Sequence, residues 1–345
     1  MSQQRQSNIE LLRCLAMLCI IVYHLCLFAL GSIATGTNLY KALQIPLHIG
    51  VPLFVLISGY FGIRFSLRGL MRLCSKGYII FIPFVVIPMI VNHTGGVKDI
   101  LKSIFIFGFD AQWYLNTYLY LFLFSPIINR YLEGITKVQR VYLLVILSFM
   151  SIYIGNVTEG DICLVEGKNL TNFLLLYTLG NTLRHYQSVV NAISQKKMVF
   201  SCVVFNILLV LGFMYVSLFA GKIWKYSFAY DSPIIMLNSI WMFAIFSKIK
   251  IQSKFINWAG GSIFACYLLQ CPPFMWKNFF ERPVQTIYGI IPQPWLIIPA
   301  MIVYALVAML IMICIDKAFN RRSLKLPWQQ VTLANQRYRA YMVKK

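Results

Sequence analysis

Two residues of the first apolar segment, Arg13 and His24, carry side chains that can take part in chemistry. An imidazole, with an unperturbed pKa of about 6.5, can accept or release a proton at neutral pH, and a guanidinium binds anions. Eleven positions separate the two residues, which in an α-helix correspond to about 1100°, or three turns plus ~20°, and to a rise of about 16 Å. They therefore share one face, and we predict an arginine in the inner half of a membrane helix and a histidine in its outer half.

Asn8 and Glu10 lie close to Arg13 in the sequence. Glu10 and Arg13 form an i, i+3 pair, which offsets part of the cost of an ionisable group at the centre of a membrane helix, about 2.5 to 3.5 kcal/mol. Two structural interpretations compete with a functional one, because Arg13 can extend to the cytoplasmic headgroups and a lone membrane histidine can be a packing residue. Since both lie on one stripe with an acid beside them, we favour a functional site.

A second group of polar residues lies in the segment 46–61. Its two prolines and two glycines are expected to break or kink the helix at both ends. His48 emerges at the outer side, while Ser58 and Tyr60 bring hydroxyl groups into the bundle, and all three are candidates for substrate binding. Small residues in membrane helices usually serve close packing, which is the simpler explanation for Ser58 and Gly59.

Two further features lie at the predicted membrane surfaces. Trp113 opens a helix at the outer interface, where it belongs either to an aromatic belt or to a substrate site. On the inner side, the predicted loop 64–76 carries four positive residues, among them Arg72. They are either a topology signal alone or a binding site for the phosphates of a nucleotide-bearing donor, which a bidentate guanidinium holds better than lysine does.

A membrane scaffold must position these residues. Of the 345 residues, 59% are hydrophobic and 12% are charged, and the mean hydropathy is +0.71, which excludes a large soluble catalytic domain such as a Rossmann fold or a barrel. Apolar windows of ~20 residues predict an all-α polytopic integral membrane protein with about ten transmembrane helices. They lie near residues 9–31, 45–63, 77–92, 113–129, 141–157, 170–187, 199–220, 233–250, 257–276 and 295–316. The segment 100–109 is predicted to lie at the interface.

The basic residues predict the orientation of the chain. The 31 Lys and Arg and ten Asp and Glu give a net charge of +21, which by itself could suggest a nucleic-acid partner. However, 22 of the positive residues fall in segments on the N-terminal side of the membrane and eight on the opposite side. This predicts both termini in the cytoplasm, a lipid bilayer rather than nucleic acid as partner, a membrane domain over 1–316 and a basic cytoplasmic tail over 317–345. Most of the nine cysteines lie in apolar stretches without a CxxC pair, so neither a disulfide framework nor a metal site is expected.

The motifs, taken in order, resemble the bacterial membrane acyltransferase family 3, which O-acylates surface glycans. They are residues 8–13 (NIELLR) followed by ten residues and His24, the segment 51–60 (VPLFVLISGY), and residues 113–115 (WYL). The resemblance covers nearly the whole chain. It implies a multi-pass protein of the bacterial cytoplasmic (inner) membrane. Such a protein takes an acyl group, usually from acetyl-CoA in the cytoplasm, and delivers it to a hydroxyl group of a surface or exported polysaccharide.

With this resemblance, His24 is interpreted as the general base or proton shuttle and Arg13 as the residue that binds the donor. The candidate substrate-binding residues are Asn8, Glu10, His48, Ser58, Tyr60, Arg72 and Trp113. Acyl-CoA is expected as a co-substrate, with no bound cofactor, and the group that stabilises the oxyanion is left open among Tyr60, Ser58 and His48. The segment 262–272 resembles a family stretch that often has His before Pro, but Gln270 stands in that place, so no second catalytic histidine is expected there.

An exporter or flippase of a glycan or lipid-linked sugar is the alternative from a different class. A transporter more often has an internal repeat and polar groups in corresponding helices of two halves, and neither is found in this sequence. A structural subunit of an envelope machine is a third possibility. Within the enzyme interpretation, succinyl or longer groups, and capsule, lipopolysaccharide, exopolysaccharide or an antibiotic sugar as acceptor, all stay open. Without a hydrolase-like domain after the last helix, the chain is expected to act alone or to pass the group to a separate protein.

Overall fold

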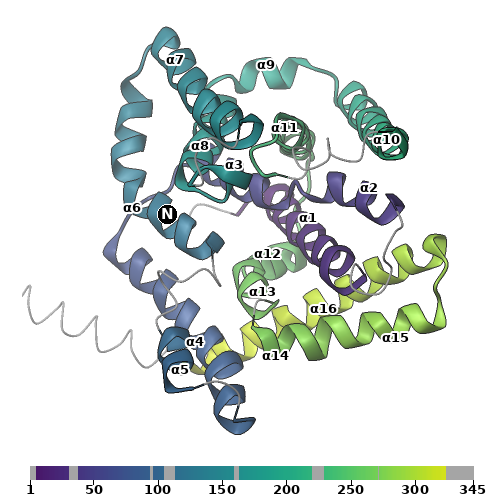
Figure 1. Cartoon of the computed structure of the whole chain (residues 1–345). Coiled ribbons are helices and arrows are strands. Elements are labelled where there is room, and N and C mark those ends of the chain that lie inside the picture. The colour runs from purple at the N-terminus through teal and green to yellow at the C-terminus, as the bar shows by residue number, and fades with distance from the viewer. Residues whose placement is uncertain are drawn as a thin grey trace, which may run out of the picture.

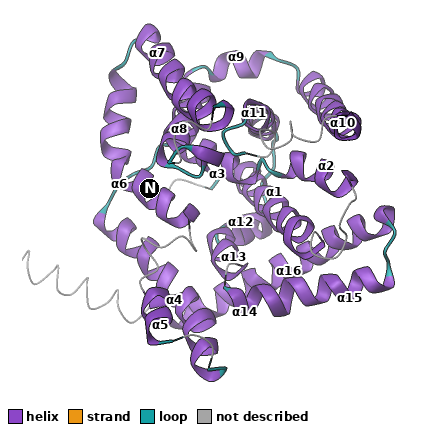
Figure 2. Cartoon of the chain, in the orientation of Figure 1, coloured by secondary structure: helices purple, strands orange, loops and turns teal. Residues whose placement is uncertain are grey.

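The computed structural model describes residues 5–30, 38–93, 96–104, 113–158, 163–219, 229–270 and 272–323, and every regular element in these ranges is helical (Figure 2). The helices of the first half are α1 Ser7–His24, η1 Leu25–Leu30, α2 Asn38–Leu47, α3 Gly50–Phe61, α4 Leu67–Val91, α5 Val97–Ile104, α6 Trp113–Gly134, α7 Lys137–Ser148 and η3 Phe149–Val157. Those of the second half are η4 Val165–Gly167, α8 Leu170–His185, α9 Gln187–Ala192, α10 Gln195–Phe219, α11 Pro233–Ser247, α12 Lys254–Gly260, α13 Ile263–Gln270, α14 Pro273–Trp276, η6 Lys277–Glu281, α15 Arg282–Ile290 and α16 Pro294–Ser323. Of the η elements, η4 is a 3₁₀ turn and the others are π-helices.

Six helical segments of the described residues are long and apolar enough to cross a membrane. They are Ser7–Leu30, Lys41–Phe61, Leu67–Val91, Lys137–Val157, Gln195–Val216 and Trp295–Phe319, and Pro233–Ser247 is a shorter apolar helix. The prediction of an all-helical chain with several membrane helices is therefore confirmed, whereas the count of ten is not.

The other predicted spans lie in helices of a different kind. Residues 113–129 belong to α6, which is rich in tyrosine, and 170–187 correspond to α8, a helix of 16 residues. The span predicted at 257–276 is divided into α12, α13 and α14, because the chain turns after Gly260 and again before α14. Hydropathy windows average over composition and do not register such breaks. The predicted interfacial segment 100–109 is helical as far as Ile104, and its remainder lies outside the described residues.

Helix α1 lies at the centre of the molecule, with α3, α11, α12, α13 and α16 around it (Figure 1). Its buried residues, among them Leu12, Met17 and Ile21, are distributed over more than one side of the helix. A helix that is apolar nearly all round is a buried helix, which agrees with this central position. Directly after His24 the backbone widens into the π-helix η1, and π-helical turns occur frequently at functional sites.

Helices α3 and α8 pack with their backbones in contact. A Cβ atom on Gly59 would lie 2.1 Å from the carbonyl oxygen of Tyr177, and one on Gly180 would lie 2.2 Å from that of Leu56. Only glycine leaves room for such an approach, as is common between membrane helices. The packing interpretation of Gly59 is therefore confirmed.

The prediction that 64–76 is a loop is wrong for most of its length. Helix α4 begins directly after Ser66, whose side chain accepts a hydrogen bond from a backbone N–H of the first turn and caps the helix. Arg68, Arg72 and Lys76 are therefore helical, and their spacing of four residues places them on one side of α4. A polar first turn of a helix and a loop have the same composition, which explains the error.

The first residues of α1 and the last turns of α16 lie at the same end of the molecule. Arg5 Nη1 donates a hydrogen bond of 3.1 Å to the carbonyl oxygen of Asn257, and Lys317 Nζ lies 5.6 Å from the ring centre of Trp258. Both contacts are made to α12, so the two ends of the described chain meet there. The predicted tail over 317–345 begins as a continuation of α16 up to Ser323, and its remainder lies outside the described residues.

The contact between α3 and α8 leads to a stability prediction. Gly180→Ala should lower the midpoint of thermal unfolding in detergent, because a methyl group would force the two backbones apart, and overpacking of this kind costs about 1–3 kcal/mol. Gly212→Ala in α10 is the matched control, since a Cβ atom there meets nothing within 4 Å. Equal midpoints for the two variants would contradict the close approach of α3 and α8.

Candidate functional site

A cavity of about 390 Å³ lies beside α1. From α1 it is lined by Arg13, Met17, Ile20 and His24, which follow one another at spacings of three or four residues and so lie on one face. Its other walls come from α3, α4, α6, α12 and α13, and from Tyr230 before α11. The volume is in the range of small-molecule sites, about 300–1,000 Å³. The cavity thus connects the level of the arginine with the level of the histidine.

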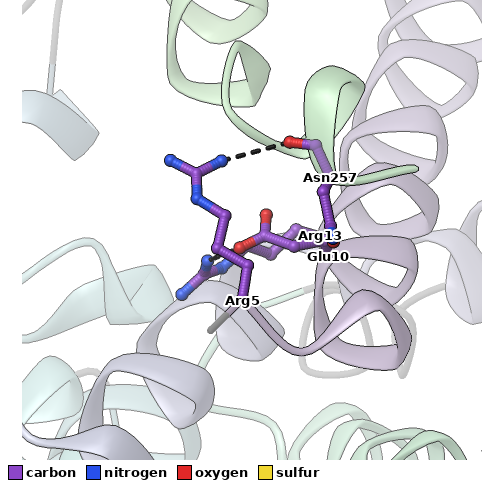
Figure 3. A network of polar contacts seen from close by, with 4 residues as sticks. All are labelled: Arg5, Glu10, Arg13 and Asn257. Atoms are coloured by element: carbon purple, nitrogen blue, oxygen red, sulfur yellow. Dashed lines mark hydrogen bonds and ion pairs between the residues drawn. The ribbon is translucent and has the colours of Figure 1, made fainter. Parts of the chain in front are cut away.

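One end of this cavity is basic. Arg13 lines it together with Arg72 and Lys76 of α4. The Nη1 atom of Arg13 donates a hydrogen bond of 2.8 Å to Oε1 of Glu10, so the predicted i, i+3 pair is present (Figure 3). Lys76 Nζ lies 3.3 Å from Oδ1 of Asp316 on α16. Three cationic side chains therefore line this end of the cavity, which suits an anionic ligand.

Glu10 forms an ion pair with Arg13 but does not itself line the cavity. The side chain of Glu10 is 6% exposed and that of Arg13 is 33% exposed, so the carboxylate is buried and the guanidinium reaches open space. A Cβ atom on Gly260 would lie 2.2 Å from Oε2 of Glu10, which means that only glycine lets α12 pass this close to the carboxylate. Glu10 thus acts on the cavity through Arg13 rather than by lining it.

His24 lies at the other end of the α1 face that lines the cavity. Its Nδ1 atom is 3.1 Å from Oε1 of Gln270, the last residue of α13. The ring centres of Phe28 and Trp276 lie 5.7 Å and 6.1 Å from that of the imidazole. The imidazole is therefore fixed by one hydrogen bond and by aromatic contacts, and it still lines the cavity.

A layer of aromatic rings forms the wall next to His24. Trp113 and Tyr230 both line the cavity, with ring centres 5.2 Å apart and planes inclined by 33°. Behind Tyr230 lies His48, with ring centres 4.2 Å apart. His48 is buried, and neither of its ring nitrogens has a hydrogen-bond partner among the described residues. Trp113 therefore lines the cavity, whereas His48 does not and lies behind the ring of Tyr230.

Hydroxyl groups line the cavity wall formed by α3 and α6. Ser58 Oγ donates a hydrogen bond of 2.8 Å to the carbonyl oxygen of Phe54 and lies 3.3 Å from the hydroxyl oxygen of Tyr118. Because the Ser58 proton is directed at Phe54, Ser58 can only accept from Tyr118. The Tyr118 proton is thus available to Ser58 or to a ligand in the cavity.

Two of the predicted site residues lie elsewhere. The side-chain amide of Asn8 donates hydrogen bonds to the carbonyl oxygens of Phe246 and Ser247 and ties α1 to the end of α11. The ring of Tyr60 packs against that of Phe243, with centres 4.8 Å apart, in a separate apolar cluster. Neither is among the residues that line the cavity.

Three residues at the site, Tyr118, Tyr230 and Gln270, were not predicted from the sequence as site residues, and Lys76 was predicted only as one of the positive residues of a loop. One signal was available for Tyr118, which follows Tyr114 by four residues and so shares its face of α6. For Gln270 the resemblance of the segment 262–272 to a family stretch was a signal, whereas Tyr230 reaches the site through contacts between distant parts of the chain, for which a single sequence carries no local signal.

The segment that holds Tyr230 contains a buried carboxyl group. The backbone N–H of Tyr230 donates a hydrogen bond of 3.1 Å to the carbonyl oxygen of Glu166, and Asp231 Oδ1 accepts one of 2.9 Å from Asn156 Nδ2. Asp231 is fully buried, and its Oδ2 has no hydrogen-bond partner among the described residues. Burial raises the pKa of the Asp231 carboxyl to about 6, although the bond from Asn156 opposes this shift.

Comparison with known proteins agrees with this geometry. A family model described as an acyltransferase domain matches residues 6–315, a range that includes all the residues lining the cavity. The chain belongs to acyltransferase family 3. This confirms the resemblance found in the sequence, and with its apolar helices the protein is a membrane acyltransferase. No curated protein and no solved structure matches the chain.

Asp231 gives this acyltransferase a predicted dependence of stability on pH. Because the pKa of its carboxyl is raised on folding, Asp231 favours the folded state most below its ordinary pKa of 3.8, and this contribution is lost as the pH rises through about 6. The melting midpoint of the wild type, relative to that of Asp231→Asn, should therefore fall between pH 4 and pH 7. Glu133→Gln, at an exposed position, is the control. A difference between wild type and Asp231→Asn that does not change with pH would exclude this role of burial.

Proposed function

We propose that this protein takes an acyl group from cytoplasmic acyl-CoA, above all acetyl from acetyl-CoA, and transfers it to a hydroxyl group of a surface or exported polysaccharide. The observation that supports this most directly is a single cavity lined by Arg13, Arg72 and Lys76 at one end and by His24 at the other. The proposal includes the bacterial cytoplasmic membrane as its location, with the basic end of the cavity facing the cytoplasm.

The donor is placed with its charged part at the basic end. The head of CoA carries several phosphate charges, which guanidinium and ammonium groups bind through charge-assisted hydrogen bonds. The remainder of CoA is a long, uncharged arm that ends in the thioester. Arg13 and His24 are about 16 Å apart along the helix axis, so an arm extended along α1 can carry the thioester carbon toward the imidazole.

The proposed reaction takes place at the end of the cavity that His24 lines. His24 takes the proton of the acceptor hydroxyl as its oxygen attacks the thioester carbonyl carbon, and a positioned base typically contributes ~10²- to 10⁴-fold. The tetrahedral intermediate then collapses, the C–S bond breaks, and the proton on His24 passes to the departing CoA thiolate. The hydroxyl of Tyr118 lines the same cavity, and because its proton is available it is the candidate for stabilising the oxyanion.

The acceptor is placed against the aromatic layer. A sugar ring has apolar C–H faces that pack on aromatic rings, and Trp113 and Tyr230 present two such rings in the cavity wall. In this proposal Trp113 binds substrate, the one of its two predicted roles that goes beyond an aromatic belt. The identity of the sugar is left to contacts beyond these two rings.

An exporter of the glycan is the second candidate, and the size of the cavity argues against it. A volume of about 390 Å³ suits one small molecule or one or two sugar units, whereas an export path must admit a chain. Glycan that reaches the surface in normal amount but without its acyl group, in cells that lack the protein, would separate the two functions.

The central test is His24→Ala. Transfer from radiolabelled acetyl-CoA to glycan in membranes should fall by at least ~10²-fold, because the hydroxyl proton then has no acceptor. His185→Ala, at an exposed histidine near the end of α8, is the matched control. The level and the melting midpoint of each variant show that it is folded. Retention of most activity by His24→Ala would remove the imidazole from the mechanism.

Arg72→Ala tests the donor end. The apparent KM for acyl-CoA should rise ~10-fold or more, since a hydrogen bond to a charged group is worth about 1.5–3 kcal/mol, and Arg72→Lys should show a smaller rise. Arg68→Ala is the control, because Arg68 lies one turn away on α4, is exposed, and is not among the residues that line the cavity. Unchanged KM values for both Arg72 variants would mean that these arginines are only a topology signal.

A further inference from the structure

Gln270 is buried at the end of α13, and both ends of its amide have partners on α1. It is 2% exposed. Its Oε1 lies 3.1 Å from Nδ1 of His24, and its Nε2 donates to the sulfur of Met17 at 3.5 Å. Met17 and His24 are seven residues apart, which is two turns less ~20°, so one glutamine side chain spans two turns on the same face of α1.

The partners of the amide determine its orientation. A thioether sulfur can only accept a hydrogen bond, so the NH₂ group belongs next to Met17. The reverse orientation would place the amide oxygen against the sulfur, two acceptors without a proton between them. The amide oxygen therefore faces His24, as the structure has it.

An amide oxygen can only accept as well, and this fixes the tautomer of His24. The contact at 3.1 Å is a hydrogen bond only if the proton of the neutral imidazole lies on Nδ1. Nε2 then carries the free lone pair. In histidines that act as bases or metal ligands, the hydrogen bond at one ring nitrogen commonly decides which state the other nitrogen has.

We propose that Gln270 is a positioning residue for His24. It holds the proton on Nδ1 and fixes the plane of the ring, so that Nε2 is the atom that takes the proton of the acceptor hydroxyl. The amide does this without adding a charge to the apolar bundle. This inference rests on the proposed function of His24, but the tautomer itself can be measured without any activity.

Histidine ¹⁵N NMR of the full-length protein in detergent or nanodiscs measures the tautomer directly, because the two ring nitrogens of each tautomer have distinct shifts. The chain has four histidines, and comparison with His24→Gln assigns the signals of His24. In the wild type we expect His24 with its proton on Nδ1. In Gln270→Leu, which has no acceptor, we expect the Nε2–H form to appear. A wild-type His24 with its proton on Nε2 would overturn the proposal.

Kinetics on the same variants test the consequence. Gln270→Leu should lower kcat for acyl transfer by ~10- to 100-fold, the usual effect of losing the partner of a functional imidazole, and should leave the KM for acetyl-CoA within about twofold. Gln270→Glu, whose carboxylate also accepts from Nδ1–H, should recover most of the lost activity. Gln285→Leu on α15, where the glutamine bonds only to Glu281 in the described part of the chain, is the matched control.

The possible failures can be distinguished. If His24→Ala abolishes transfer while Gln270→Leu retains more than half of kcat, the positioning role of Gln270 is wrong and the proposed function stands. If His24→Ala itself retains activity, the proposed role of His24 fails, and the NMR result then decides only whether Gln270 sets the tautomer. A Gln270→Glu variant as impaired as Gln270→Leu, at a normal melting midpoint, would mean that the amide serves packing alone.

Discussion

The structure depends on how a buried acidic residue of α1, Glu10, is accommodated. Glu10 pairs with Arg13, and Oε2 of Glu10 lies only 2.2 Å from the place that a Cβ atom at position 260 would take. Because Gly260 is also the last residue of α12, the close contact and the break of the helix coincide. The chain then re-enters the bundle as α13, which ends at Gln270 next to His24. The same broken helix thus packs against Glu10 near one end of α1 and contacts His24 at the other.

The cavity is a consequence of this arrangement rather than a separate feature. Several of the helices that line it end or are interrupted there: α1 gives way to a π-helix after His24, α12 and α13 are separated by two residues, and α4 begins with basic residues where a span would be apolar. Uninterrupted apolar helices such as α10 lie at the periphery (Figure 1). Regular apolar helices thus lie on the outside, and several of the helices around the cavity are interrupted.

The sequence could predict what lies within one helix. The shared face of Arg13 and His24 and the pair of Glu10 with Arg13 follow from the helical repeat, and both are found in the structure. It could not predict contacts such as that of His24 with Gln270, which joins residues 246 positions apart. Nor could composition distinguish the first turns of α4 from a loop, or a continuous span from the divided helices α12 to α14. In each of these cases caps, glycines and tertiary packing decide, and a hydropathy average contains none of them.

The distribution of charge along the cavity bears on how an acyl group could cross a membrane without a transporter. Phosphates are far too costly to move into an apolar bundle, whereas a thioester and a small acyl group are uncharged. In the proposed function, a cavity with cations at one end and an imidazole at the other sorts the donor by its own chemistry, because the cations hold the charged head and only the neutral arm advances. A neutral partner for His24 fits this proposal, since Gln270 lies 3.1 Å from the imidazole without adding a buried charge beside it.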